Sequence, residues 1–238
     1  MILYYVRHGD PIYDPNQLTP LGRRQAEAVA KRLAVYGVDK IYSSPSKRAR
    51  ETAQPLCEIL KMEPQILDWS DEDLVYRDMV LKKENGDITW ACGHPTGRVQ
   101  FSSHEVLSLG REWYTHPCFA DTNFGPGINR IQQAGDAFLL SLGYRHDLEN
   151  NCFYAERDND QRIALFAHGG VGAALLSCIL DIPYPLFSTR FDMTHSSVTV
   201  IELREEHGIV IPCVLTYAND SHLYREGLPT KHQNRICY

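Results

Sequence analysis

The chain has 238 residues, of which 43% are hydrophobic and 23% are charged. This composition is typical of a folded globular protein and excludes a disordered or collagen-like chain, and the length fits one large domain or one domain with an insertion. The 24 Lys and Arg residues stand against 30 Asp and Glu residues, which gives a net charge of -6. Because nucleic-acid-binding proteins usually present a basic surface, this charge argues against a nucleic-acid partner.

The cysteines and the apolar segments exclude further classes of protein. The seven cysteines lie far apart and form no C-x-x-C pair, so neither a disulfide framework nor a zinc knuckle is predicted. Free thiols are typical of a reducing cytoplasm. The apolar residues 1–6 lack the basic region of a signal peptide, and residues 171–180 are far shorter than a membrane span of about 20 residues. We therefore expect a cytoplasmic protein that does not bind a membrane.

The N-terminal region predicts a strand followed by a helix. Residues 1–6 are apolar and rich in aromatic side chains, which is typical of a strand buried on both faces of a parallel sheet. Thr19 and Pro20 then supply an N-cap and a first-turn proline. The helix that they open is expected to end near Tyr36, because a glycine follows there.

A second strand–helix unit precedes a segment of different character. Residues 40–43 predict a strand, and Ser46 is expected to cap a helix with one apolar face. Residues 61–128 then break this pattern with an acidic patch, a turn at Asn85–Gly86 and a stretch rich in Gly and Pro. We predict that they form a cap inserted into the domain.

The remaining elements complete an α/β fold. A helix is expected at residues 129–142, a strand at 163–167, and an apolar helix that ends near Leu180. Two strands at residues 198–203 and 209–215 are expected to form a hairpin. The alternation of strands and helices predicts a three-layer sandwich, in which a mostly parallel central sheet has helices on both faces. The whole chain, 1–238, is then a single domain with one inserted cap.

Three of the predicted strands lead into loops with basic or imidazole side chains. These loops hold Arg7-His8-Gly9, Arg48 and His168-Gly169-Gly170. Because the carboxyl ends of parallel strands meet in one crevice, and because helix N-termini offer N–H donors to anions, we expect these groups to converge. Arginine suits such a site because its planar fork binds two phosphoryl oxygens at once. The sequence therefore predicts a phosphate pocket.

These motifs resemble those of the histidine phosphatase superfamily, which has the phosphoglycerate-mutase-like fold. Arg7-His8-Gly9 matches the family's R-H-G signature, and residues 18–26 match its L-T-x-x-G-x-x-Q-A helix start. Residues 43–53 match its S-S-P-x-x-R-A-x-x-T-A segment, and His168 matches the second histidine. The matches cover the first quarter of the chain and a short segment around the second histidine.

The resemblance implies a metal-independent phosphomonoesterase that needs no cofactor and acts on a small phosphorylated metabolite. His8 would attack phosphorus and form a phosphohistidine, because a neutral imidazole is a competent nucleophile near neutral pH. Arg7, Arg48 and His168 would stabilise the charge on the phosphoryl oxygens. Water would then release phosphate.

The leaving alkoxide also needs a proton. In the acid-phosphatase branch of the superfamily an aspartate after the second histidine supplies it, but Gly169 stands there in this sequence. The resemblance is therefore to the mutase-like branch, in which an acidic residue beyond the second strand–helix unit is the donor. Asp68, Asp71, Glu72 and Asp73 occupy that interval. We predict Glu72, because it has the longest side chain of the patch and glutamate ionises closer to neutral pH than aspartate; Asp71 and Asp73 are the alternatives.

The loop after His8 departs from the family pattern. Asp10, Pro11 and Asp14 stand where the family often has Glu, Thr or Ser, and Asn. Asn16 is a candidate replacement for the missing amide contact to phosphate if the loop follows a different course, and the backbone at Gly169 is a further candidate. The acidic side chain of Asp14 would disfavour a very highly charged substrate.

Other residues are expected to have structural or secondary roles. Four histidines lack metal-ligand spacing and are expected at the surface, in the core or in the pocket lining: His94, His104, His195 and His222. Three aromatic residues are expected in the core of the cap: Trp90, Trp113 and Tyr114. Three residues of the first helix are expected to support the loop after His8: Thr19, Gly22 and Gln25.

Two other functions stay open at this point. The first is a mutase that returns the phosphoryl group to its substrate, although the mutases tend to have arginine where Asp73 follows Glu72. The second is a catalytically silent member that binds a phosphorylated ligand or a protein, although such a protein need not keep the nucleophile. The substrate and the oligomeric state are not predicted, with a homodimer as one option. The polar residues 228–238 form either a tail or a packed arm.

Overall fold

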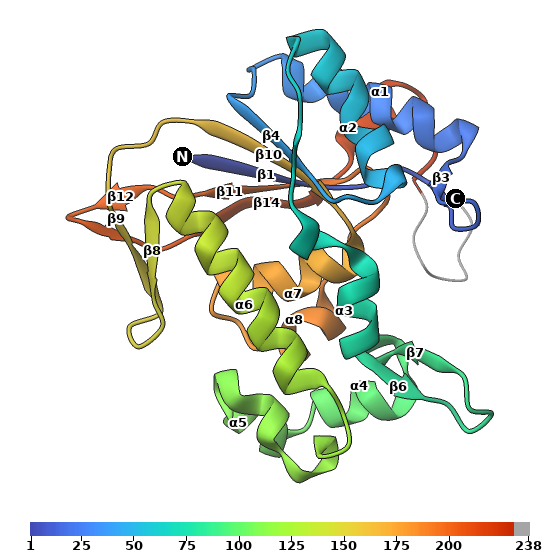
Figure 1. Ribbon diagram of the computed structural model, residues 1–238, viewed down its shortest axis with the longest axis vertical. Coiled ribbons are helices and arrows are strands. Elements are labelled where there is room, and N and C mark those ends of the chain that lie inside the picture. Colours follow the sequence, from blue (N-terminus) through green and yellow to red (C-terminus); the bar gives the residue numbers. More distant parts are fainter. Residues whose placement is uncertain (231–238) are drawn as a thin grey trace.

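The computed structural model describes residues 1–230, and its middle layer is a six-stranded sheet (Figure 1). The strand order is β14-β11-β1-β10-β4-β5. The strands are β1 (Ile2–Arg7), β4 (Lys40–Ser43), β5 (Gln65–Ile66), β10 (Arg162–Ala167), β11 (Val198–Glu202) and β14 (Cys213–Asn219). β1, β10, β4 and β5 run parallel, whereas β11 is antiparallel to both of its neighbours. The mostly parallel sheet is confirmed.

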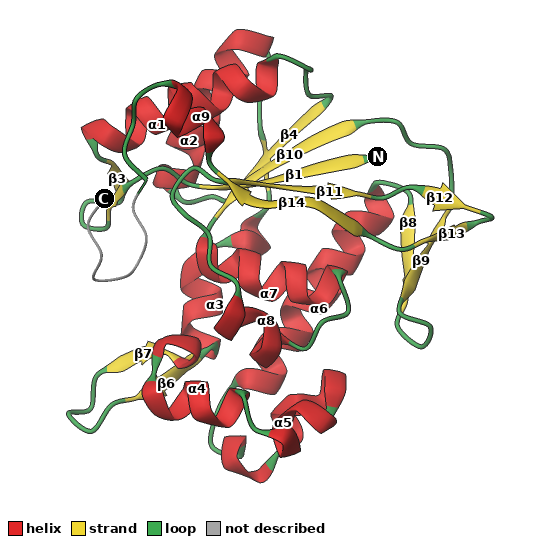
Figure 2. Cartoon of the chain, turned by 180° about the vertical axis from the view of Figure 1, so that it is seen from behind, coloured by secondary structure: helices red, strands yellow, loops and turns green. Residues whose placement is uncertain are grey.

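Helices cover both faces of this sheet (Figure 2). One face carries α1 (Pro20–Ala34) and α2 (Lys47–Leu60), with α9 (Ser221–Arg225) beside α1. The other face carries α3 (Glu72–Asp78), α6 (Phe124–Ser141), α7 (Gly169–Ile179) and α8 (Tyr184–Arg190). Successive side chains of β10 point to opposite faces, so Phe166 packs with α1 and α2 while Leu165 packs with α6 and α7. The predicted three-layer sandwich is therefore confirmed.

The first helix follows its sequence signals closely. The Thr19 hydroxyl accepts a hydrogen bond of 2.9 Å from the Gly22 amide, and Pro20 occupies the first turn. α1 ends at Ala34, slightly before the predicted limit near Tyr36. Ahead of it, β2 (Pro11–Ile12) and β3 (Gln17–Leu18) form a small hairpin.

The second helix begins differently from the prediction. Ser46 occupies the N-cap position of α2, but its side chain makes no capping hydrogen bond, so the predicted capping role is wrong. The Ser46 hydroxyl instead contacts the side chain of Asn16, whose Oδ1 accepts a hydrogen bond of 3.3 Å from the Arg48 amide. An asparagine from the turn between β2 and β3 therefore satisfies a free donor at the start of α2.

The segment between β5 and α6 is built from short elements below the main layers (Figure 1). In chain order these are η1 (Asp68–Ser70), α3, β6 (Val80–Lys82), β7 (Ile88–Trp90), η2 (Ala91–Gly93), α4 (Pro95–Phe101), α5 (His104–Ser108), η3 (Gly110–Thr115) and η4 (Pro117–Phe119). The predicted turn at Asn85–Gly86 lies between β6 and β7. Trp113 is buried in an aromatic cluster with Phe101, whereas Tyr114 is half-buried.

The helix α6 begins at Phe124, earlier than the predicted start at residue 129 and inside the predicted cap limits of 61–128. The misleading signals were Gly125 and Gly127, which are typical of loops. Their actual role is close packing, because a Cβ atom would lie 2.7 Å from the Tyr114 ring at the first position and 2.4 Å from Asp78 Cβ at the second. The role of this segment as a cap of a single domain stays a prediction.

The C-terminal part contains a second sheet that the sequence did not predict. β8 (Tyr144–Asp147), β9 (Cys152–Ala155), β12 (Glu205–Glu206) and β13 (Ile209–Val210) form it in the order β12-β13-β9-β8. The predicted strand 209–215 is divided between two sheets: residues 209–210 form β13 and pair with β9, whereas residues 213–215 begin β14, which pairs antiparallel with β11 as predicted. Pro212 separates the two pieces, because proline has no N–H to continue a ladder.

Other expectations concern the C-terminus, the cysteines and the membrane. Leu228 is buried against Leu223 and Ala28, and residues 231–238 of the predicted tail or arm lie outside the described residues. The six cysteines within residues 1–230 are free thiols. None of the helices in the same range combines the length and apolar character that a bilayer crossing needs.

One buried ion cluster links several elements below the sheet. His146 on β8 lies 2.8 Å from Asp136 of α6 and 3.2 Å from Asp181, measured from its two ring nitrogens to the carboxylate oxygens. Its ring stacks on Phe153 with centroids 3.9 Å apart. Although burial opposes the charge, the hydrogen bonds with Asp136 and Asp181 raise the pKa of His146 to about 9.

We predict that His146 makes the stability of the fold depend on pH. Because its pKa is raised in the folded state above the usual 6.5, its contribution is complete below pH 6.5 and is lost as the pH rises through 9. The free energy of unfolding of His146→Gln should lie roughly 2–3 kcal/mol below that of wild type near pH 6, measured by urea titration. The difference should shrink near pH 9.5. His104→Gln, on the exposed side of α5, is the control and should match wild type; a His146→Gln deficit that is constant across this range would contradict the prediction.

Candidate active site

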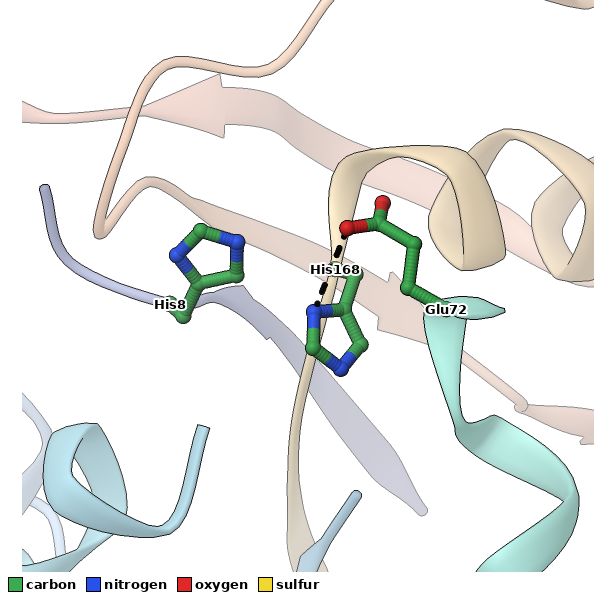
Figure 3. A group of neighbouring side chains, drawn as sticks. All are labelled: His8, Glu72 and His168. Carbon is green, nitrogen blue, oxygen red and sulfur yellow. Dashed lines mark ion pairs between the residues drawn. The ribbon is translucent and has the colours of Figure 1, made fainter. Parts of the chain in front are cut away.

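Three strand ends meet at the carboxyl edge of the central sheet. In the β1–β10 pair, Arg7 lies opposite Ala167, so the residues that follow, His8 and His168, are neighbours. Their ring centroids are 5.2 Å apart (Figure 3). β4 pairs with the other side of β10 and brings Ser44 to the same edge. The structure thus brings together groups that are far apart in the sequence.

His8 is buried and held in one tautomer. Its Nδ1 lies 2.7 Å from the carbonyl oxygen of Gly9. Because a carbonyl oxygen can only accept, Nδ1 carries the proton and Nε2 keeps a free lone pair. Burial, together with the nearby His168 and Arg7, lowers the pKa of His8 well below its usual value. The ring is therefore neutral at pH 7, which is the form of imidazole that can act as a nucleophile.

The backbone after His8 is fixed by close contact with the first two helices. The Gly9 amide donates a hydrogen bond of 3.0 Å to the Thr52 hydroxyl of α2. A Cβ atom on Gly9 would lie 2.6 Å from the carbonyl oxygen of Gly22, and one on Gly22 would lie 2.2 Å from that of Asp10. Both positions therefore need glycine for the loop to approach α1.

Asp10 belongs to the support of this loop. Its amide donates a hydrogen bond of 2.7 Å to Gln25 Oε1, and its carboxylate accepts one of 2.8 Å from the Thr19 hydroxyl. Thr19 and Gln25 thus support the loop, as the sequence predicted. The other carboxylate oxygen lies 3.5 Å from Nδ1 of His195, whose ring stacks on His8 with centroids 5.6 Å apart.

Two arginines supply positive charge beside His8. Arg7 and Arg48 are 6% and 5% exposed, and both line the same pocket. Arg7 Nη1 donates to the Met193 carbonyl oxygen, and Arg48 Nη2 donates to Glu72 Oε2 at 2.9 Å. The buried Nε atoms of both arginines have no hydrogen-bond partner within residues 1–230. Since buried donors are normally satisfied, this arrangement suits an anion that accepts from both side chains.

His168 is a second neutral imidazole. The Ser44 hydroxyl lies 2.8 Å from His168 Nε2 and accepts from the Ser46 amide, so its own proton is available to Nε2. Nδ1 then carries the ring proton. Burial and the charge of Arg48 lower the pKa of His168 to about 3. Its Nδ1 lies 3.5 Å from Oε2 of Glu72, as Figure 3 shows.

Glu72, at the start of α3, reaches this group from the segment between β5 and α6. Its Oε1 accepts a hydrogen bond of 3.0 Å from the Gly170 amide at the N-terminus of α7, and its Oε2 pairs with Arg48. The other two candidate proton donors make different contacts: Asp71 caps α3 by accepting from the Asp73 amide, and Asp73 is an exposed residue of the pocket lining. Of the three carboxylates, Glu72 is the one placed beside both the arginine and the second histidine.

The remaining predicted site residues fall into two groups. Gly169, the first residue of α7, and Asn16 both line the pocket with the two arginines. Of the four other histidines, His195 lies beside His8 as described. The other three are not among the pocket lining: His94, His104 and His222. The stacking of His195 on His8 was not predicted, because it depends on a loop that no motif marks.

The same side chains could in principle ligate a metal ion. His8, Glu72 and His168 each offer one ligand atom, and these atoms lie within 4.8 Å of one another (Figure 3). However, Arg7 and Arg48 place two positive charges beside them, and like charges repel strongly in a buried site. The charge of the site therefore favours an anion over a cation.

Comparisons with known proteins give consistent results. Residues 3–72 match the family model described as the histidine phosphatase superfamily (branch 1). A probable phosphatase of Schizosaccharomyces pombe is 30% identical over 246 residues, which cover 95% of this chain and 97% of that protein. Phosphoserine phosphatase 1 of Hydrogenobacter thermophilus is 22% identical, over 90% of this chain and 92% of that protein.

Solved structures show the same fold. A mutant phosphoserine phosphatase from Entamoeba histolytica, in complex with phosphoserine, aligns with a TM-score of 0.59 and 20% identity over 93% of this chain and 98% of that one. A mycobacterial glucosyl-3-phosphoglycerate phosphatase aligns with a TM-score of 0.57 and 19% identity, over 91% and 98%.

We predict distinct ionisation states for three histidines near pH 6. His8 and His168 should be neutral with the proton on Nδ1, because burial lowers both pKa values, whereas His146 should be protonated. Two-bond ¹H–¹⁵N spectra of the imidazole rings separate these states, and single histidine-to-asparagine variants assign the signals. A His8 ring that gains its second proton near pH 6.5 would contradict the prediction.

Proposed function

Because the chain belongs to the histidine phosphatase superfamily and is a phosphatase, we propose that it hydrolyses a phosphomonoester through a covalent phosphohistidine on His8. The observation that carries the proposal is the neutral His8 ring, whose Nε2 is free because Nδ1 is bound to the Gly9 carbonyl. Buried donors without partners surround this ring, as a phosphoryl site requires.

In the first step Nε2 of His8 attacks phosphorus in line with the leaving group. A phosphorus–nitrogen bond forms, the phosphorus–oxygen bond to the alcohol breaks, and its electron pair leaves with that oxygen. Arg7, Arg48 and the Nδ1–H of His168 donate hydrogen bonds to the three other oxygens. These donors are already in place before the reaction, so the charge of the transition state needs little reorganisation of the site.

Glu72 is the proposed general acid. An incoming phosphoryl dianion competes with its carboxylate for Arg48, and its negative charge favours the protonated form of the carboxyl group. The carboxyl proton then passes to the leaving oxygen. In the second step the carboxylate accepts a proton from water, the water oxygen bonds to phosphorus, and the electron pair of the broken phosphorus–nitrogen bond returns to His8.

The relatives support hydrolysis of small phosphorylated metabolites. Their names describe phosphatases of phosphoserine and of glucosyl-3-phosphoglycerate, and the present chain covers most of their length. The free thiols within residues 1–230 support our expectation that the enzyme works in the cytoplasm. The mutase hypothesis lacks comparable support, since the cationic side chains among the described pocket residues are Arg7 and Arg48, both beside His8.

We expect His8→Ala to lower kcat for p-nitrophenyl phosphate at least about a thousandfold, because the nucleophile is lost. Wild-type activity should be unchanged by EDTA. Rapid denaturation at neutral to alkaline pH, followed by mass spectrometry of the peptide with residue 8, should detect an acid-labile phosphate in wild type only. His104→Ala, on exposed α5, is the control. Full activity of His8→Ala, or activity that EDTA abolishes, would overturn the proposal.

We expect the effect of Glu72→Gln to depend on the leaving group. For p-nitrophenyl phosphate the leaving oxygen is acidic and needs little proton transfer, so kcat/KM should fall less than for an alkyl phosphate. For the alkyl ester a loss of roughly a hundredfold or more is expected. Asp68→Asn, an exposed change in the same acidic patch, is the matched control. An equal loss with both esters would show that Glu72 does not protonate the leaving group.

A further inference from the structure

Aromatic side chains form a substantial part of the wall of the active-site pocket. The pocket has a volume of about 680 Å³, far more than one phosphoryl group needs. Six aromatic side chains from separate parts of the chain line it: Tyr13, Tyr76, Trp90, Tyr184, Phe191 and Tyr217. Pockets of this size usually bury most of a ligand, so there is room to bind the leaving group as well as the phosphoryl group.

Trp90 connects this wall to the catalytic groups. Its ring packs edge-on against Tyr76, with centroids 5.1 Å apart. A Cβ atom at Gly170 would lie 2.2 Å from Trp90 Cη2, so the indole lies directly on the first turn of α7. One residue earlier, a Cβ atom at Gly169 would lie 3.3 Å from the Arg7 guanidinium carbon. The aromatic surface therefore begins next to the site of phosphoryl transfer.

Phe191 and Tyr217 form another part of the wall. Their ring centroids are 5.2 Å apart, and Phe191 also stacks on Phe187. Phe191 is nevertheless 43% exposed, which leaves apolar surface available to a ligand. The hydroxyl oxygen of Tyr217 is buried without a hydrogen-bond partner among residues 1–230, so it can bind one polar atom of a substrate.

Within residues 1–230, the charged side chains that line the pocket are two arginines and three acidic residues. Among the described lining residues, the positive charges are those of Arg7 and Arg48, which are engaged with the phosphoryl site. Three acidic residues line the same pocket, namely Glu72, which pairs with Arg48, and the exposed Asp73 and Asp192. A carboxylate on the leaving group would therefore meet charges of its own sign instead of a cation, and such a contact lowers affinity.

We propose that the substrate is the phosphate monoester of an alcohol that carries an aromatic or similarly apolar ring and no carboxylate. This proposal rests on the phosphatase reaction described above. The ring of the leaving group packs against Trp90 and Tyr76, and its polar substituent is bound by Tyr217. The chain then differs in substrate class from the phosphoserine and glucosyl-3-phosphoglycerate phosphatases to which its fold is similar.

Four alkyl phosphates test separately whether the enzyme prefers a ring and whether it disfavours a carboxylate on the leaving group. Ethyl phosphate and 2-phenylethyl phosphate differ by the ring, and O-phospholactate and O-phospho-3-phenyllactate are the same pair with a carboxylate added next to the ester oxygen. Their leaving oxygens are all alkoxides, so differences in kcat/KM report mainly on recognition. The ring should raise kcat/KM at least tenfold, and the carboxylate should lower it at least tenfold.

The outcomes separate this proposal from the reaction on which it rests. If p-nitrophenyl phosphate is hydrolysed through phosphohistidine but ethyl phosphate or the carboxylate esters match 2-phenylethyl phosphate, the substrate class is wrong while the reaction stands. If none of the esters, including p-nitrophenyl phosphate, is hydrolysed, both proposals fail.

Trp90 provides the second test. In Trp90→Ala the preference for 2-phenylethyl over ethyl phosphate should fall at least fivefold, and Trp90→Phe should restore most of it because an aromatic ring is retained. Tyr224→Ala is the control, because this aromatic side chain is 91% exposed and lies outside the pocket. It should leave the preference for 2-phenylethyl over ethyl phosphate unchanged. If Trp90 has a purely structural role, Trp90→Ala will lower kcat/KM for 2-phenylethyl phosphate and ethyl phosphate in parallel. An unaltered ratio of the two values would overturn the proposal that Trp90 binds the ring of the substrate.

Discussion

The parallel pairing of β10 with β1 on one side and β4 on the other is the constraint on which the site depends. Arg7 lies opposite Ala167 in this register, and each strand end is followed directly by a group of the site. A shift of one residue would turn the side chains of a strand to the other face of the sheet. Such a shift would be costly along β10, because its successive side chains are packed into two different clusters, one on each face of the sheet. The packing of the core thus holds the two imidazoles together.

The segment between β5 and α6 completes what the sheet begins. The sheet edge supplies His8, the arginine next to it and His168, which bind and receive the phosphoryl group in the proposed mechanism. Glu72 and Trp90 both come from the inserted segment, and both contact Gly170 at the start of α7. The groups proposed to act on the leaving alcohol are therefore on a different part of the chain from those proposed to act on phosphorus. Gly170 joins the inserted segment to the sheet edge, because its amide donates to Glu72 and its lack of a side chain leaves room for the Trp90 ring.

The sequence predicted the elements whose signals are local. The strand–helix units around His8 and His168 follow from apolar periodicity, caps and glycines, and the motifs there named the groups that the structure brings together. The predicted start of α6 failed because long-range packing decides it: Gly125 and Gly127 lie within the helix where neighbouring side chains press against them. The predicted strand 209–215 failed for a local reason, because Pro212 divides it between two sheets. The aromatic residues of the pocket wall were not predicted to lie together, because they come from distant segments without a shared motif.

The three buried donors of the site also affect the protein when no substrate is bound. Arg7 Nε, Arg48 Nε and His168 Nδ1 have no hydrogen-bond partner within residues 1–230, and each such group costs roughly 1–3 kcal/mol of folding free energy. A tetrahedral oxyanion that accepts from them shifts the folding equilibrium toward the native state by mass action. Inorganic phosphate, the second product, is such an oxyanion. Because inorganic phosphate is the second product of the proposed reaction, it should compete with the ester for the same three donors.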